Sequence, residues 1–197
     1  MASSSRPRRS ADESRQALVA AALALFRERP PDRVGVREIA AAAGVNHGLV
    51  HRLFGGKDAL VTAVLREVFR ETGLAISEGL DDDLTAALGR GLDVLARERW
   101  VVDVVAHVML RQRSADGIPG ATMMPLLRER LGDRATDDLA VAVATAEAAT
   151  LGWLLFEPLV ARGTGLDSRS ADERRAGVAR ILARMLRAEL DAVEPPL

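Results

Sequence analysis

Two short helical segments separated by a glycine occupy residues 36–55, which read VREIAAAAGVNHGLVHRLFG. Two packed helices need a small residue where they cross, and Ala40 supplies one. Gly44 stands where the turn between the segments requires a positive φ. Apolar residues can lock the second segment onto the first, namely Ile39, Ala43, Val45, Val50 and Leu53. The pattern predicts a helix-turn-helix, a motif that holds the N-terminal half of its second helix in the major groove of DNA.

Helical periodicity continues through the rest of the chain and predicts an all-α fold of about nine helices. The sequence is rich in Ala, Leu and Arg, with 3% aromatic residues and no tyrosine, which disfavours sheet. Capping boxes at Ser10 with Glu13 and at Ser170 with Glu173 predict two helix starts. Pro30-Pro31 predicts the end of the first helix. Further helices are expected from Lys57, from 81–83 to about 99, and over 100–113, 123–131 and 136–162.

The charge is unevenly distributed along the chain, although the net charge is only −1. Residues 1–60 hold 10 Lys and Arg against 6 Asp and Glu, whereas residues 61–197 hold 17 against 22. A basic head on an acidic body predicts that the head meets a polyanion. Residues 1–9 are polar and without periodicity, so we expect a disordered basic arm there.

Several other classes of protein are disfavoured by composition. The absence of cysteine excludes disulfides and thiolate chemistry. No run of 18 apolar residues is free of charge and no signal peptide is evident, so we expect a cytoplasmic protein without a membrane segment. Three histidines, two of them in one helix, offer no catalytic spacing. Asp81-Asp82-Asp83 suits a helix start better than a metal site. We expect no metal, no cofactor and no enzyme activity.

Residues 15–65 resemble the DNA-binding segment of the TetR family of regulators. The resemblance runs through Arg15-x-x-Leu18-Val19-x-Ala21-Ala22-x-x-Leu25-Phe26, then Val36-x-x-Ile39-Ala40-x-x-Ala43-Gly44-Val45 and Phe54-x-x-Lys57-Asp58-x-Leu60. It implies a homodimeric, repressor-like protein that binds double-stranded operator DNA and is released by a small-molecule effector. The chain would then divide into an arm (1–9), a helix-turn-helix domain (10–56) and a ligand-sensing and dimerisation domain (57–197).

The chain departs from the family pattern at four positions. Gly35 replaces a capping Thr, His51 a Tyr, Leu53 a His and Gly56 a capping Ser. The imidazole N–H of His51 can still donate to a phosphate oxygen. We therefore predict DNA contacts from residues on and beside the motif: Arg37, Asn46, His47, His51, Arg52 and Lys57. Asn46 is expected mainly to cap its helix. A helix-turn-helix used only to bind another protein remains the alternative, although the polar outer side of the second helix disfavours it.

Two further sets of residues are candidates in the second domain. An apolar ligand pocket with one polar group could be lined by Trp100, His107, Met109, Met123, Met124 and Trp153, although Met and Trp at helical spacing usually form core. Small and apolar stripes on the last two long helices predict a dimer interface that includes Ala142, Ala146, Ala149, Trp153, Val178, Ile181, Leu182 and Met185.

Overall fold

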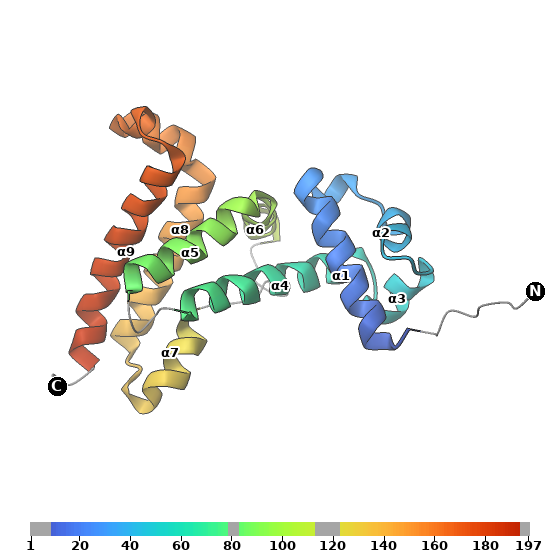
Figure 1. Cartoon of the computed structure of the whole chain (residues 1–197), viewed down its shortest axis with the longest axis horizontal. Helices are drawn as coiled ribbons and strands as arrows, with labels where there is room; N and C mark the ends of the chain where they lie inside the picture. The colour runs from blue at the N-terminus through green and yellow to red at the C-terminus, as the bar shows by residue number, and fades with distance from the viewer. Residues whose placement is uncertain (1–8, 79–82, 113–122, 194–197) are drawn as a thin grey trace, which may run out of the picture. The chain divides into compact units, whose positions relative to one another are not determined.

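The computed structural model describes residues 9–78, 83–112 and 123–193, and within these ranges the chain is helical throughout, with no strand (Figure 1). The α-helices are α1 (Ala11–Glu28), α2 (Val36–Ala42), α3 (Gly48–Phe54), α4 (Lys57–Ser77), α5 (Leu84–Arg97), α6 (Arg99–Gln112), α7 (Met123–Leu131), α8 (Asp137–Thr164) and α9 (Ala171–Val193). Short 3-10 turns cover Pro31–Arg33, Gly132–Arg134 and Leu166–Ser168. The all-α prediction is confirmed. The predicted arm, apart from Arg9, and the expected loop over 114–121 lie outside the described residues.

Local sequence signals fix most helix starts. Ser10 and Glu13 form the predicted capping box of α1, because each side chain accepts a hydrogen bond from the other residue's backbone N–H. Ser170 and Glu173 form the same arrangement at the start of α9. The carboxylate of Asp83 caps α5 by accepting from the backbone N–H groups of the next turn. The predicted capping role is therefore confirmed for Asp83, whereas Asp81 and Asp82 lie outside the described residues.

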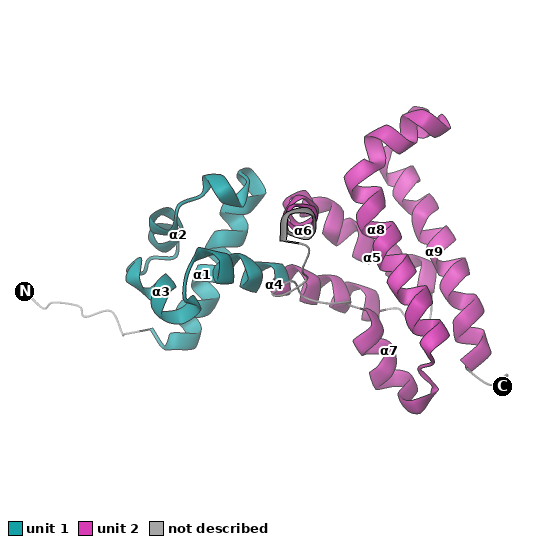
Figure 2. Ribbon diagram, turned by 180° about the vertical axis from the view of Figure 1, so that it is seen from behind, with its two compact units in different colours: residues 1–65 teal, residues 66–197 magenta. Residues whose placement is uncertain are grey.

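The chain forms two compact units, residues 1–65 and 66–197, so the division falls inside α4 (Figure 2). In the first unit α1 packs against α2 and α3. The side chains of Leu18, Phe26, Ile39, Val50 and Leu60 are all at most 2% exposed. These residues lie at helical spacing on one face of each element, so burial of the apolar stripe holds the small three-helix unit together.

The second unit is built around α8 and α9, against which α5, α6 and α7 pack. Its core combines Leu84, Leu88 and Leu92 of α5 with Leu127 of α7, Leu139 and Val143 of α8, and Leu182 and Leu186 of α9. At the division between α5 and α6 the helix breaks at Glu98, two residues before the predicted start at Trp100. Glu98 is buried at this break, and its carboxylate accepts a hydrogen bond from Nε1 of Trp100 at 3.0 Å.

One helix of the described chain, α8, is long and apolar enough to cross a membrane when judged by length and composition alone. Its mean hydropathy reaches 1.7 over an 18-residue window. One side of α8 packs into the core of the second unit through Leu139, Val143 and Ala146. The other side exposes Val141, Phe156 and Leu159. The helix therefore has two apolar sides, and the described residues cover only one of them.

Candidate nucleic-acid interface

The turn between α2 and α3 contains the positive φ that the sequence predicted at Gly44. Gly44 has φ of 67°. Its N–H donates to the carbonyl of Ala41 at 3.0 Å, and the N–H of Val45 donates to that of Ala40 at 2.9 Å. This pair of bonds is a Schellman motif, which satisfies the last carbonyls of α2. A residue with a side chain would be strained at position 44, so the glycine is required for α3 to leave α2 at this angle.

The start of α3 is held by Asn46. Its Oδ1 accepts a hydrogen bond from the backbone N–H of Gly48 at 2.8 Å. Asparagine in this position satisfies one of the free N–H groups that open a helix. His47, directly before α3, already has helical backbone angles (φ −60°, ψ −27°) and makes no side-chain capping bond, so the bond to Asn46 gives this residue the capping role that was expected. The start of α2 at Gly35 lacks a side-chain cap. At the other end of α3, Gly55 has φ of 84° and donates to the carbonyl of His51 at 2.9 Å.

The outer side of α3 is polar and open. Asn46, His47, His51 and Arg52 are all exposed, while Val50 on the opposite side is fully buried. His47 and His51 are four residues apart on a helical backbone and so share one face. Neither imidazole has a hydrogen-bond partner among the described residues. The exposed side of α3 therefore offers several hydrogen-bond donors to a ligand.

The two flanking cations lie at the beginnings of other helices. Arg37 is exposed in the first turn of α2, and Lys57 is the first residue of α4. Lys57 is half-buried, with Nζ 3.5 Å from the carbonyl oxygen of Asp32. Helix N-termini present free backbone N–H groups and a partial positive charge, so a cation there adds to an existing preference for phosphate.

Three arginines on or beside α1 contact the helix-turn-helix. None of these contacts was predicted from the sequence. Arg15 donates from Nη2 to the carbonyl of Leu53, and its guanidinium carbon lies 4.5 Å from the centroid of the Phe54 ring. Arg9 donates to the carbonyl of Ala43 at 2.8 Å. Arg29 forms an ion pair with Glu38 of α2. That bond lowers the pKa of the Glu38 carboxyl below its ordinary value, chiefly by hydrogen bonding from Arg29.

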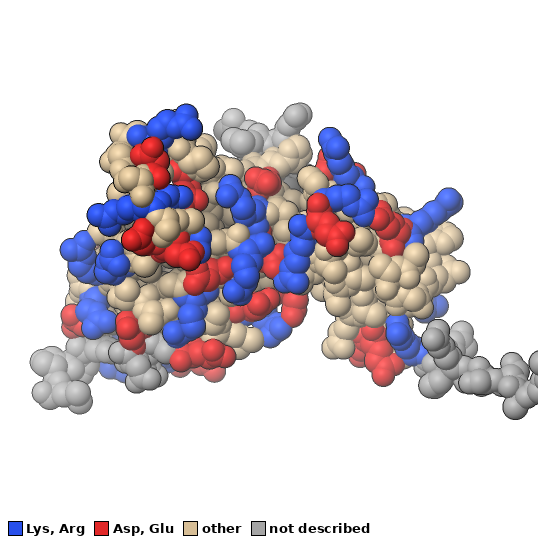
Figure 3. All heavy atoms as spheres, turned by 45° about the horizontal axis from the view of Figure 1, so that its top comes forward, with Lys and Arg blue, Asp and Glu red and all other residues tan. Residues whose placement is uncertain are grey.

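Cationic and anionic side chains are interspersed on the face drawn in Figure 3 rather than gathered by sign. A uniform basic surface of the kind that binds any polyanion is not visible there.

The candidate ligand residues are distributed over different environments. Met123 and Met124 are buried in the core of the second unit, and Trp100 is buried beside Glu98. His107 is exposed, and the side chain of Met109 lies outside the described residues. Trp153 is half-buried, and its buried Nε1 has no hydrogen-bond partner among the described residues. Whether these residues line a pocket stays a prediction.

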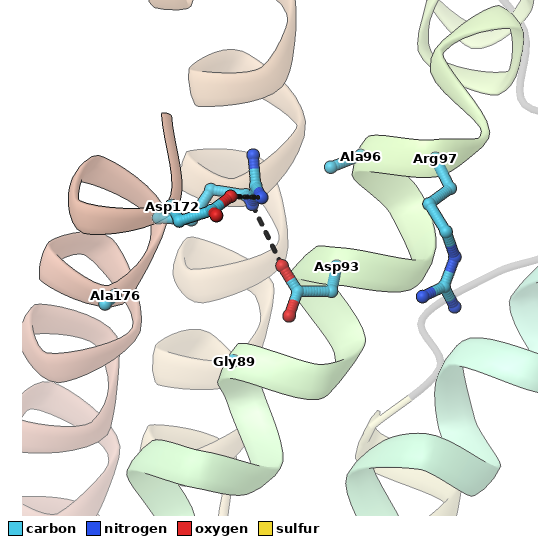
Figure 4. Close-up of a pocket in the computed structure, with 7 residues that line it drawn as sticks. Gly89, Asp93, Ala96, Arg97, Asp172 and Ala176 are labelled. Carbon is cyan, nitrogen blue, oxygen red and sulfur yellow. Dashed lines mark hydrogen bonds and ion pairs between the residues drawn. The ribbon is translucent and has the colours of Figure 1, made fainter. Parts of the chain in front are cut away.

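A groove of about 550 Å³ lies elsewhere, between α5 and α9 (Figure 4). Its lining consists of Gly89, Asp93, Ala96, Arg97, Asp172, Arg175 and Ala176, none of which was predicted to bind ligand. Arg175 donates from Nε to Asp93 at 2.9 Å and also pairs with Asp172. The charged groups of the groove thus largely satisfy one another, and they join α5 to the start of α9.

Residues predicted for the dimer interface divide into two groups. Ala142, Ala146 and Leu182 are buried in the core of their own chain. Ile181 is 56% exposed, Ala149 is exposed, and Val178, Met185 and Trp153 are half-buried. A dimer interface on α8 and α9 stays a prediction, and the periodicity could not tell the side of each helix that faces the chain's own core from the side left open.

The helix-turn-helix, with its capped α3 and polar outer side, defines the class of the protein as a DNA-binding regulator. Residues 18–64 match the model of the family described as bacterial regulatory proteins, tetR family. The chain is 39% identical over 178 residues to the HTH-type transcriptional repressor Rv3405c of Mycobacterium tuberculosis, covering 89% of this chain and 90% of that protein. The chain belongs to the tetR family.

Solved structures show the same fold. A tetR-family regulator from Streptomyces coelicolor superposes with a TM-score of 0.57 at 22% identity, covering 91% of this chain and 90% of its own. RolR in complex with resorcinol gives a TM-score of 0.50 at 20% identity, covering 95% of this chain and 96% of its own. The resemblance inferred from residues 15–65 is thereby confirmed, and it extends to the helical body whose sequence was not diagnostic.

Proposed function

We propose that the protein is a homodimeric repressor that leaves its operator when a small, mainly apolar effector binds the helical body. The observation that carries the DNA-binding part is α3 itself. It is a short helix that is exposed on a polar side, it follows the Schellman turn that ends α2, and the side chain of Asn46 accepts a hydrogen bond at its start. A transcriptional regulator of this kind would act in the cytoplasm, where bacterial DNA lies.

The DNA contacts we propose fall into two kinds. His47, at the start of α3, would face base edges, where its ring nitrogens can exchange hydrogen bonds. Arg37 and Lys57 would contact phosphates on either side and so set the register of α3 along the groove. His51 would donate to a phosphate in place of the usual tyrosine, and Arg52 would add a further cation beside it.

The exposed apolar side of α8 supports the homodimer. Val141, Phe156 and Leu159 are 65%, 51% and 72% exposed, and Ile181 of α9 is 56% exposed. An exposed apolar stripe on a long helix is costly in water and usually marks an interface. Ala148, Ala149 and Gly152 lie between these residues and would let a second α8 approach closely. Two such helices from each chain would form a four-helix bundle, which can bury well over about 1,000 Å².

A dimer places two copies of α3 on the DNA, so it constrains the operator. Two recognition helices read successive major grooves when they lie about 34 Å apart, which corresponds to one turn of DNA. Selection of bound duplexes from a random-sequence library tests the proposal directly. We expect an enriched inverted repeat with half-sites about one turn apart, or a multiple of it. Enrichment of a single half-site would contradict the dimer, and the absence of enrichment would contradict the repressor role.

The effector part of the proposal rests on α4, which runs from Lys57 to Ser77 and is shared by the two units. A ligand that shifts α4 would change the spacing of the two α3 helices. RolR, which shares the fold, binds resorcinol. A hundredfold loss of operator affinity requires about 2.7 kcal/mol of coupling, which is ordinary for allostery. Coupling is reciprocal, so ligand titrations with and without operator DNA should differ by the same factor. Equal ligand affinities would contradict it.

A further inference from the structure

Helix α3 has little support of its own. It contains seven residues, Gly48–Phe54, and Val50 is its one fully buried side chain. A helix of two turns is not stable in isolation, because nucleation costs more than so few hydrogen bonds return. The direction of α3 therefore depends on what the rest of the first unit provides at its two ends. Asn46 serves the N-terminal end.

Arg15 of α1 serves the C-terminal end in two ways. Its Nη2 donates to the carbonyl oxygen of Leu53, and its guanidinium group stands over the Phe54 ring, 4.5 Å from the centroid. The last carbonyls of a helix have no partner within the helix, and a cation placed there also meets the negative end of the helix dipole. A planar guanidinium can donate and stack at once, whereas an ammonium group cannot.

Arg15 is itself anchored on a rigid element. The opposite side of α1 buries Leu18, Ala22 and Phe26, which are at most 2% exposed. A comparable contact exists at the other helix of the motif, where Arg9 donates to the carbonyl of Ala43 at the end of α2. Each helix of the motif thus ends on an arginine from α1 or from the residues just before it.

We propose that Arg15 is a positioning residue for DNA recognition: it fixes the C-terminal end of α3 and so aims His47 and His51 without contacting DNA itself. This inference rests on the proposed placement of α3 in the major groove. The guanidinium already donates from Nη2 to Leu53 and stacks on Phe54, although Arg15 remains exposed, so the salt dependence of binding separates a positioning role from a phosphate contact. Loss of Arg15 should weaken binding through misalignment and leave the number of neutralised phosphates unchanged.

The test compares wild-type protein, Arg15→Ala and Arg15→Lys on the duplex that the wild type selects from a random library. We expect Arg15→Ala to bind about tenfold more weakly, in line with the loss of a hydrogen bond from a charged donor. The slope of log affinity against log salt should stay unchanged, whereas loss of a phosphate contact would lower it by about one. Arg66→Ala serves as the control for loss of one positive charge, because Arg66 is exposed on α4 and forms no hydrogen bond or ion pair with the described residues.

Hydrogen exchange supplies the readout that general destabilisation would not give. The N–H of Gly55, bonded to the carbonyl of His51, should exchange faster in Arg15→Ala, while amides in the middle of α1 keep their rates. Arg15→Lys keeps one donor but not the stack, so its affinity should fall between the other two. The binding stoichiometry reports the folded fraction separately from the affinity.

Any of three results would overturn the inference. A salt slope lower by about one would make Arg15 a phosphate contact. Unchanged operator affinity would show that α3 needs no support from it. If Arg15→Ala does not fold, an Arg15→Lys protein with wild-type affinity and wild-type exchange at Gly55 overturns the inference equally. A wild-type protein that binds no duplex would instead refute the proposed DNA contacts, and the exchange result would still report the role of Arg15 in the fold.

Discussion

Gly91 of α5 lies directly against Ile76 of α4: a Cβ atom at position 91 would fall 2.7 Å from Cγ1 and 2.8 Å from Cδ1 of Ile76. Ile76 is buried and branched at Cβ, so its side chain has little freedom to move aside. Next to this contact, Nε of Arg90 donates to the carbonyl of Ala75 at 2.9 Å. The end of α4 is thus fixed on α5 by backbone proximity as well as by a hydrogen bond.

This contact predicts opposite effects for two neighbouring glycines of α5. Gly91→Ala should destabilise the protein by about 1–3 kcal/mol, the usual cost of overpacking. Gly89→Ala is the matched control, because its Cβ would meet only Ala179 at an ordinary 4.0 Å. That variant should be more stable than wild type by up to about 1 kcal/mol, since alanine favours helix. Denaturant unfolding of both variants measures this, and equal effects would contradict the packing described.

The ion pair between Arg29 and Glu38 predicts a pH dependence of stability. The pKa of Glu38 is lowered in the folded protein, so its contribution is present above the unfolded pKa and is lost as pH falls through the folded one. This contribution to stability should therefore be lost at pH values below about 4.3, the usual pKa of glutamate. Glu38→Gln should remove this part of the acid sensitivity.

A double-mutant cycle separates the ion pair from other effects of losing a carboxylate. In an Arg29→Gln background, Glu38→Gln should change the acid midpoint of unfolding far less than it does in the wild type. The reason is that the hydrogen bond from Arg29 contributes most to lowering the pKa of Glu38. Equal shifts in the two backgrounds would show that the pair is not coupled.

The proposed dimer predicts that Leu159→Asp produces a monomer. Leu159 is 72% exposed on α8, so the substitution should leave the fold of the chain intact while burying a charge in the bundle. Sedimentation should show a monomer at micromolar concentration, and operator affinity should fall because one α3 reads only one half-site. Leu74→Asp, at a 49% exposed position on α4, is the matched control and should remain dimeric. A dimeric Leu159→Asp protein would exclude the α8 interface.

Signals confined to a few neighbouring residues were predictable from the sequence. The capping boxes at Ser10 and Ser170 depend on residues three apart, and the positive φ at Gly44 depends on the turn alone. The contact of Arg15 with Leu53 joins residues 38 apart, and that of Arg9 with Ala43 joins residues 34 apart. Such pairs are set by how helices pack, and no local pattern marks them.

Helical periodicity also leaves open which partner an apolar face meets. Met123 and Met124 fit the pattern of a pocket lining equally well, and the structure buries both in the core of the second unit. Ala142 and Ala146 lie on the same helix as the exposed Val141, yet they face the chain's own core. The sequence of α8 has apolar residues on two sides of the helix. Only the packing of α8 against α7 and α9 shows which of these sides remains exposed.

In the proposed function the first unit binds DNA through α3, with Arg37 and Lys57 as phosphate contacts on either side. The direct measurement is the salt dependence of binding to duplex DNA by wild-type protein and by the Arg37→Ala, Lys57→Ala double variant. We predict weaker binding to all duplexes and a slope of log affinity against log salt that is smaller by about two. A folded double variant with unchanged affinity and unchanged slope would contradict the claim.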